Sequence, residues 1–427
     1  MFSIRKIRMK TLLHHRASWA VYDQVLVSGA NFLSTLIIAR MLAPEVFGMF
    51  SLASLAILFL ASFHRTLITQ PMNALGSTES FNKLAWRYAG LMRMQLPMIS
   101  ISILILACIG LVFFPDLGLI IGASSYLAGF FLQEMVRRYH YTKGDIQRAL
   151  INDLISYGGQ IIVLASLYAT GFADAAFAFI ALAVTSLTAF LYGQRDIRNH
   201  QALMLAPVVS VPSGNLLEEH WKFAKWIVLS QFVFWGATQV YPFILANQNS
   251  YAEVADFNVA NSILNALNII RLMLGNYLPA RVSVVYASGG TAALRRLLLR
   301  TLILAGGVSL IVILVLMLSA NWLVDILFAG KYPLAGQLVG WLAFAYVASI
   351  ISVVTNAGAL PLKATNWIFY ANGVGTMFSL GFGPFLVARF GVWGAIAGLC
   401  VASFLPALIQ GVHVFYKCRP INDTKQS

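Results

Sequence analysis

Residues 17–24 read ASWAVYDQ, and residues 224–231 read AKWIVLSQ. The two stretches are 207 positions apart and share Ala, Trp, Val and Gln in the same order. Farther along the chain, a displacement of 220 matches Lys143 with Lys363 and Asn152 with Asn372. The sequence therefore contains two copies of one unit, and the displacement between them grows once, by 13 residues.

Both copies are very apolar. Of the 427 residues, 59% are hydrophobic and only 10% are charged, which excludes an ordinary soluble globule. A bilayer core needs about 20 helical residues per crossing, and twelve such segments can be placed, six in each half. The sequence predicts an all-α, polytopic membrane protein with two pseudo-symmetric six-helix lobes. This duplication is typical of transporters whose two lobes surround a central pathway.

The predicted domain limits follow from these segments. A basic tail at 1–17 precedes the amino-terminal lobe at 18–193, a linker at 194–221 leads to the carboxy-terminal lobe at 222–416, and a tail at 417–427 follows. Because six crossings return the chain to its starting side, both lobes are expected to share one orientation in the membrane. No outer loop is long enough to hold a separate catalytic domain.

The net charge of +14 would favour nucleic-acid binding in a soluble protein. Here, outside the spans, only Arg40, Lys331 and Arg389 lie on one side, while the other Lys and Arg residues lie in alternate loops and in both tails. This positive-inside pattern predicts cytoplasmic termini, contacts with membrane lipids and no nucleic-acid partner. The three cysteines are scattered, so we expect no disulfide framework, no metal site and no cofactor.

The eighth predicted segment, 254–279, carries a stripe of asparagines with Arg271 beside it. The stripe comprises Asn258, Asn261, Asn265, Asn268 and Asn276. At 100° per residue these positions fall within an arc of about 80° on a helix. Asparagines can simply join membrane helices to one another. A polar stripe of this length beside an arginine favours a hydrated pathway instead.

The repeat places polar residues at matching depths in the first lobe. His64 and Arg65 correspond to Arg271 and Leu272, and Ser51 and Ser54 correspond to Asn258 and Asn261. Arg65 can line the same pathway or extend toward the headgroups, and Arg93 is better explained by the second alternative. Three amides complete the candidate lining, namely Gln24, its repeat partner Gln231, and Gln239.

Two acidic residues lie well inside predicted spans, Asp23 and Glu134. Glu134 has Arg137 and Arg138 at helical spacing, which favours a structural ion pair over a role in ion coupling. Asp23 has no partner nearby in sequence. It can pair with an interior arginine, or it can bind and release the proton that drives transport.

Short motifs resemble those of a known family. The first predicted helix ends in ARML at 39–42, PEVFG at 44–48 leads into FSLA at 50–53, and FGVWGAIAG lies at 390–398. With twelve spans in two lobes, these motifs resemble the polysaccharide flippases of the multidrug/oligosaccharidyl-lipid/polysaccharide (MOP) superfamily, in particular the O-antigen (Wzx-type) translocases. The resemblance covers nearly the whole chain.

The resemblance implies a V of two helix bundles that opens alternately to each side of the bacterial inner membrane. It implies export of an undecaprenyl-diphosphate-linked oligosaccharide for lipopolysaccharide O-antigen, capsule or exopolysaccharide biosynthesis. It also implies coupling to an H⁺ or Na⁺ gradient, and polysaccharide polymerase and chain-length proteins as partners. The residues suit this cargo, because Arg65 and Arg271 can bind a diphosphate and the amides can bind sugar hydroxyls.

Two other classes remain as alternatives. A drug or cation antiporter of the same superfamily would require acidic residues in its cavity, and here the candidate interior cations match or outnumber the acids. A membrane enzyme acting on lipid-linked glycans would require paired carboxylates or a nucleophile beside a base. The sequence offers neither arrangement, so we expect a transporter and not an enzyme.

Overall fold

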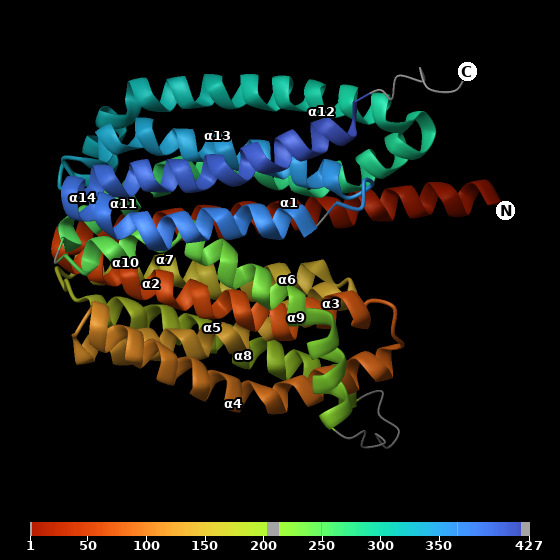
Figure 1. The fold of residues 1–427 in the computed structure, drawn as a ribbon. Helices are drawn as coiled ribbons and strands as arrows, with labels where there is room; N and C mark the ends of the chain where they lie inside the picture. Colours follow the sequence, from red (N-terminus) through yellow and green to blue (C-terminus); the bar gives the residue numbers. More distant parts are fainter. Residues whose placement is uncertain (1, 203–212, 249, 365, 420–427) are drawn as a thin grey trace, which may run out of the picture. The chain divides into compact units, whose positions relative to one another are not determined.

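The computed structural model describes residues 2–202, 213–248, 250–364 and 366–419. These residues form helices and short turns, and no strand is found among them. They divide into two compact units, Met1–Leu229 and Ser230–Ser427. Figure 1 shows long helices lying lengthwise beside one another within each unit.

The first unit contains six helical rods. Two of the rods contain a single π-helical turn, η1 or η2. In chain order the rods are α1 (Phe2–Met41); α2 (Pro44–His64) with η1 (Arg65–Thr69) and α3 (Gln70–Gly76); α4 (Phe81–Phe113); α5 (Leu117–Lys143); α6 (Ile146–Asp153) with η2 (Leu154–Gly158) and α7 (Gly159–Ala169); and α8 (Ala175–Ala202).

The second unit also contains six rods, and glycine kinks divide its two longest helices. The elements are α9 (Ser213–Thr238), which begins in the first unit, with α10 (Tyr241–Ala246); α11 (Tyr251–Leu264) with the 3₁₀ turn η3 (Asn265–Leu267); α12 (Asn268–Phe328), kinked at Gly289 and Gly290; α13 (Ala335–Ala359); and α14 (Asn366–Lys417), kinked at Gly391.

The element boundaries confirm the duplication. Helices α2 and α11 begin 207 residues apart, and helices α6 and α14 begin 220 residues apart. Gly171 and Gly391, which the repeat pairs, both have positive φ angles, 72° and 55°. An L-residue rarely adopts this conformation, so each lobe uses a glycine to turn the chain between its last two rods.

The predicted fold class is confirmed. In the described part of the chain, nine helices are long and apolar enough to cross a membrane, and α14 makes two rods because it folds back at Gly391.

Small residues allow the rods to pack closely. A Cβ atom on Gly122 of α5 would lie 2.6 Å from the Ala176 carbonyl oxygen of α8. This close approach is typical of membrane helix pairs.

Several helices extend beyond the predicted segments. Helix α1 includes most of the basic tail, α8 continues to Ala202, and α9 begins at Ser213, so both ends of the linker predicted at 194–221 are helical. The eighth predicted span is interrupted by η3 and continues as helix past 279. Hydropathy marks only the apolar part of a helix, whereas charged residues such as Lys, Arg and Glu also favour helix formation. The functional limits of the lobes and linker remain predictions.

Candidate functional site

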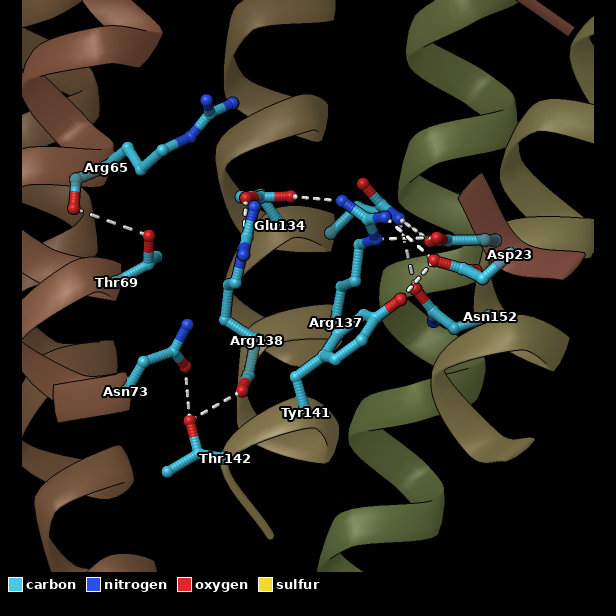
Figure 2. Close-up of polar contacts among 12 residues, drawn as sticks. Asp23, Arg65, Thr69, Asn73, Glu134, Arg137, Arg138, Tyr141, Thr142 and Asn152 are labelled. Carbon is cyan, nitrogen blue, oxygen red and sulfur yellow. Dashed lines mark hydrogen bonds and ion pairs between the residues drawn. The ribbon is translucent and has the colours of Figure 1, made fainter. Parts of the chain in front are cut away.

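A charged cluster lies inside the first unit, centred on Arg137 of α5. The guanidinium contacts three carboxylates from three elements (Figure 2). Its Nε lies 2.5 Å from Asp153 Oδ2 of α6, one Nη lies 2.9 Å from Asp23 Oδ2 of α1, and the other Nη lies 3.4 Å from Glu134 Oε2 of α5. All four side chains are buried. Residues that are 114 positions apart in sequence thus share one buried ion-pair network.

Neutral groups and a second arginine surround this network. Tyr141 donates a hydrogen bond to Asp23. Gln133 donates to Asp153 Oδ1 at 2.9 Å and to Asn152 Oδ1 at 3.1 Å, and Asn152 in turn donates to the Ala189 carbonyl of α8 at 2.7 Å. Arg138 Nε lies 2.6 Å from Glu134 Oε1. Helices α1, α5, α6 and α8 are therefore joined through polar side chains.

The cluster has more acidic than basic groups. Three carboxylates contact two guanidinium groups, and the charge of nearby Arg65 also acts on one of them, Glu134. Asp23 Oδ1 is buried with no hydrogen-bond partner. A buried carboxylate oxygen without a hydrogen-bond donor is costly. Arg137 already lies among the carboxylates, so its charge opposes a metal cation there. In the described part of the chain, no group of acidic, His or Cys side chains has the arrangement of a metal site.

The second lobe lacks this cluster. The positions that correspond to Asp23, Glu134, Arg137 and Asp153 are Ser230, Val354, Ala357 and Gly373. The second lobe forms the same series of rods with these small or apolar residues. The same series of rods can therefore form without charged residues at these positions.

The two predicted coupling acids, Asp23 and Glu134, thus lie in one cluster. Glu134 pairs with both arginines predicted from the spacing on its helix. Asp23 pairs with Arg137, one of those same arginines. The ion-pair contacts expected for Glu134 are confirmed, and a role of either acid in ion coupling stays a prediction.

Arg65 lies beside this cluster on the neighbouring rod (Figure 2). It is the first residue of η1, it is exposed, and its charge acts on Glu134. Its neighbour His64 is buried instead, with Nε2 3.0 Å from Gln95 Oε1 and its ring stacked on Phe131. The second π-turn, η2, directly follows Asp153. Such turns are frequent at functional sites of helices.

The second unit carries a polar face made by α11, η3, α12 and α13. Tyr346 of α13 donates to Asn261 Oδ1 at 2.9 Å and approaches Asn265 Oδ1 at 3.4 Å. One turn along α13, Ser349 Oγ lies 3.5 Å from a terminal nitrogen of Arg271. Arg271 is half-buried. Two asparagines of the predicted stripe and Arg271 therefore face the same helix.

Other predicted lining residues have varied positions. Asn258 is half-buried on α11, and the side chain of Asn268 lies outside the described residues. Gln24 is exposed and donates to Ser28 Oγ at 3.0 Å. Gln231 on α9 and Gln239 in the turn before α10 are half-buried. The stripe is not on one continuous α-helix as predicted, because η3 interrupts it with a tighter turn of about three residues.

Asp153, Tyr346 and Ser349 were not predicted as site residues. A signal for Asp153 was available, since this acid directly follows Asn152, which the repeat pairs with Asn372. A signal for Tyr346 was its match to Tyr126 at the same displacement. Ser349 had no such signal, because serine is common on apolar helices and its contact with Arg271 depends on packing.

No protein-family model matches the sequence, and no curated protein matches it. Solved structures do match. An inward-facing multidrug resistance MATE family transporter of the MOP superfamily is 16% identical with a TM-score of 0.74, over 94% of this chain and 96% of the other. MATE in complex with MaL6 is 14% identical, with a TM-score of 0.61 and 93% of each chain covered.

A third match is a MOP superfamily transporter from Pyrococcus furiosus, described as having a binding pocket of reverse polarity that suggests a different function. It is 15% identical, with a TM-score of 0.55, and 93% of each chain is covered. Similarity at this level of identity concerns the fold. The chain is a polytopic helical protein of two lobes with the fold of the MATE transporters of the MOP superfamily.

Proposed function

We propose that this protein is a proton-coupled flippase that moves an undecaprenyl-diphosphate-linked oligosaccharide across the bacterial inner membrane by alternating access. In this proposal the protein is a transporter and not an enzyme, and both of its termini are cytoplasmic. The oligosaccharide that it moves is used to synthesise a surface polysaccharide. The observation that carries this proposal is the difference in charge between the lobes. Buried acids gather around Arg137 in the first lobe, whereas Arg271 and amides form the polar face of the second.

The second lobe suits an anionic, hydroxyl-rich cargo. Arg271 suits a phosphate group, because the arginine side chain is cationic and offers several N–H donors in a planar arrangement. Because Asn261 accepts the Tyr346 hydroxyl through its carbonyl oxygen, its amide N–H groups are directed elsewhere and can donate to sugar oxygens. Arg65, which is exposed, adds a cation on the first lobe.

The first lobe suits proton coupling. When Asp23 binds a proton, its ion pair with Arg137 becomes a weaker hydrogen bond, and Arg137 remains paired with Asp153 and Glu134. Protonation therefore weakens the link between α1 and α5 without leaving Arg137 unpaired. A change of this kind gives the proton gradient a way to favour one conformation of the lobe over another.

A drug antiporter of the same superfamily is the second candidate, because the fold matches multidrug transporters and the first lobe contains buried acids. A cationic drug needs a carboxylate that is accessible and not already paired. Here the carboxylates of the cluster are buried and contact Arg137. This arrangement favours the flippase.

The test deletes the gene for this protein in a bacterium that needs the protein to make its surface polysaccharide. We expect lipid-linked oligosaccharide to accumulate in that strain, as measured by mass spectrometry. Wild-type protein and Arg271→Lys should reduce the accumulation, and Arg271→Ala should not. Arg281→Ala, which removes an exposed arginine farther along α12, is the matched control and should behave as wild type. Drug sensitivity without oligosaccharide accumulation would support the antiporter instead.

A further inference from the structure

The π-turn that begins at Arg65 is hydrogen-bonded to a helix far along the chain. The Leu67 carbonyl within η1 lies 3.0 Å from Nδ1 of His220, which is 153 residues later in the first turns of α9. A π-turn interrupts the regular hydrogen-bond ladder of a helix, so a carbonyl there is available to another element. His220 is 1% exposed and Leu67 is half-buried, so this bond is partly buried.

Arg87 of α4 fixes the state of His220. A terminal nitrogen of Arg87 lies 3.2 Å from His220 Nε2. Arginine can only donate, so Nε2 is the acceptor and the imidazole is neutral. The ring proton is then on Nδ1, where it donates to the Leu67 carbonyl. Both nitrogens of His220 have a partner, and together they set the orientation of the ring.

Arg87 is itself held on two sides. Its side chain is 1% exposed. It donates to Glu79 from Nε at 2.9 Å and from a terminal nitrogen at 2.7 Å, and it donates to Glu219 at 3.1 Å. Glu79 lies in the turn before α4, and Glu219 is adjacent to His220 on α9. Paired bonds between guanidinium and carboxylate restrict direction as well as distance.

We propose that Arg87 and His220 are positioning residues that set the conformation of η1 and thereby the placement of Arg65. We call Arg87, His220, Glu79 and Glu219 the η1 latch. The effect on transport rests on the proposed function, in which Arg65 contacts the cargo. Helix α9 continues without a break from His220 into the second unit, so the latch also joins η1 to the element that leads to the other lobe.

The competing explanation is that the latch only stabilises the first unit. A purely structural contact would lower the unfolding temperature and leave the properties of each folded molecule unchanged. A positioning contact changes the local order of η1 and the apparent affinity for cargo. Hydrogen exchange of the folded protein separates these explanations, because it reports local opening segment by segment.

The experiment compares four purified full-length proteins, namely wild type, His220→Phe, Glu219→Gln and Glu218→Gln. Glu218 is the matched control, because it is next to Glu219 and pairs only with exposed Lys222 among the described contacts, at 2.7 Å. His220→Phe keeps an aromatic ring and removes both hydrogen bonds. Glu219→Gln keeps the shape of the side chain and weakens the hold on Arg87, so it provides a milder variant if His220→Phe does not fold.

We expect amide exchange across 65–72 to be about tenfold faster in His220→Phe, and moderately faster in Glu219→Gln. Amide exchange in α8 of both variants should match that of wild type, and so should exchange at 65–72 in Glu218→Gln. Unchanged exchange at 65–72, or a uniform increase across the first unit, would overturn the positioning role.

A transport measurement completes the test. In proteoliposomes with lipid-linked oligosaccharide, His220→Phe should raise KM by about the factor that Arg65→Gln does, and the double variant should be no worse than the stronger single variant. Independent, multiplying effects would overturn the link to Arg65. If wild type moved no lipid-linked oligosaccharide, the proposed function would fail, whereas the exchange result would still decide whether the latch orders η1.

Discussion

Arg137 and Asp23 form a buried ion pair at 2.9 Å in the first lobe, and the repeat replaces them with Ala357 and Ser230 in the second. Two lobes with the same order of rods therefore differ at this cluster. Buried ion pairs contribute little net stability compared with apolar residues of similar size. Their presence in only one lobe is better explained by function than by folding.

The first prediction concerns proton coupling. Asp23→Asn keeps the size of the side chain and its capacity to accept from Tyr141, but it cannot be ionised. Transport driven by an imposed pH gradient should fall at least about tenfold, because one protonation state of the lobe is lost. The measurement is uptake into proteoliposomes with and without the gradient. Glu45→Gln, at an exposed acid on α2, is the control, and an unaltered pH dependence in Asp23→Asn would contradict the coupling role.

The second prediction concerns stability. Arg137→Ala leaves the carboxylates of Asp23 and Asp153 buried without their common partner, and should cost about 3 kcal/mol or more. Adding Asp153→Gly gives both positions the residues found in the second lobe, Ala357 and Gly373, and should recover part of the lost stability. Thermal unfolding in detergent measures both effects. A double variant less stable than Arg137→Ala would contradict this account.

The third prediction concerns the polar face of the second lobe. Tyr346→Phe keeps the ring and removes the hydroxyl that binds Asn261. We expect KM for the lipid-linked oligosaccharide to rise by about threefold to tenfold, because one neutral hydrogen bond that orients a binding residue is lost. The control is Tyr126→Phe at the repeat-equivalent position, where the ring packs near Phe130 and Phe179. Equal effects of the two changes would argue against a specific role for Tyr346.

The fourth prediction concerns pH and the η1 latch. Burial lowers the pKa of His220 below its ordinary value of 6.5, and this effect outweighs the hydrogen bond to the Leu67 carbonyl, which raises the pKa. The charge of Arg87 also lowers it, against smaller opposing effects of Glu219 and Glu79. The unfolded chain therefore binds a proton at a higher pH than the folded chain does. The resulting stability is complete above pH 6.5 and is lost as the pH falls toward the lowered pKa.

Thermal unfolding between pH 7.5 and 5 should show this loss, and His220→Phe should flatten it. Glu79 acts in a lower window. Its hydrogen bonds with Arg87 hold its pKa below the ordinary 4.5, so its contribution is lost only below that pH. If the unfolding temperature falls between pH 6.5 and 5 as steeply in His220→Phe as in wild type, groups other than His220 cause the loss.

The fifth prediction concerns the turn inside α14. Gly391 has φ 55° and ψ −135°, a combination that is essentially restricted to glycine. Gly391→Ala should destabilise the protein by about 2 kcal/mol from strain alone. The new Cβ would also lie 3.1 Å from a carboxylate oxygen of Glu253. Gly373→Ala, in open space on the same helix, is the control and should not destabilise. Unfolding temperatures of the two variants measure the difference.

The number of rods, their division into two lobes and the repeat that relates them could be predicted from the amino-acid sequence. These features depend on properties local to each segment. An apolar run of about 20 residues must cross the bilayer as a helix, since its backbone groups have no other partners there. The spacing of 220 residues likewise pairs Gly171 with Gly391, and both glycines have positive φ angles in the structure.

The contacts between polar residues of different helices could not be predicted in this way. Asp23 has no partner nearby in sequence, and it meets Arg137 because α1 packs along α6 and the long Arg137 side chain of α5 reaches it. Asp153 is a single acid in an apolar segment. Tyr346 and Ser349 likewise face the asparagine stripe and Arg271 because α13 packs against α11 and α12. Helical spacing predicts neighbours on one helix, as it did for Glu134 with Arg137 and Arg138. Contacts between helices depend on how whole rods rotate and pack, which no single segment specifies.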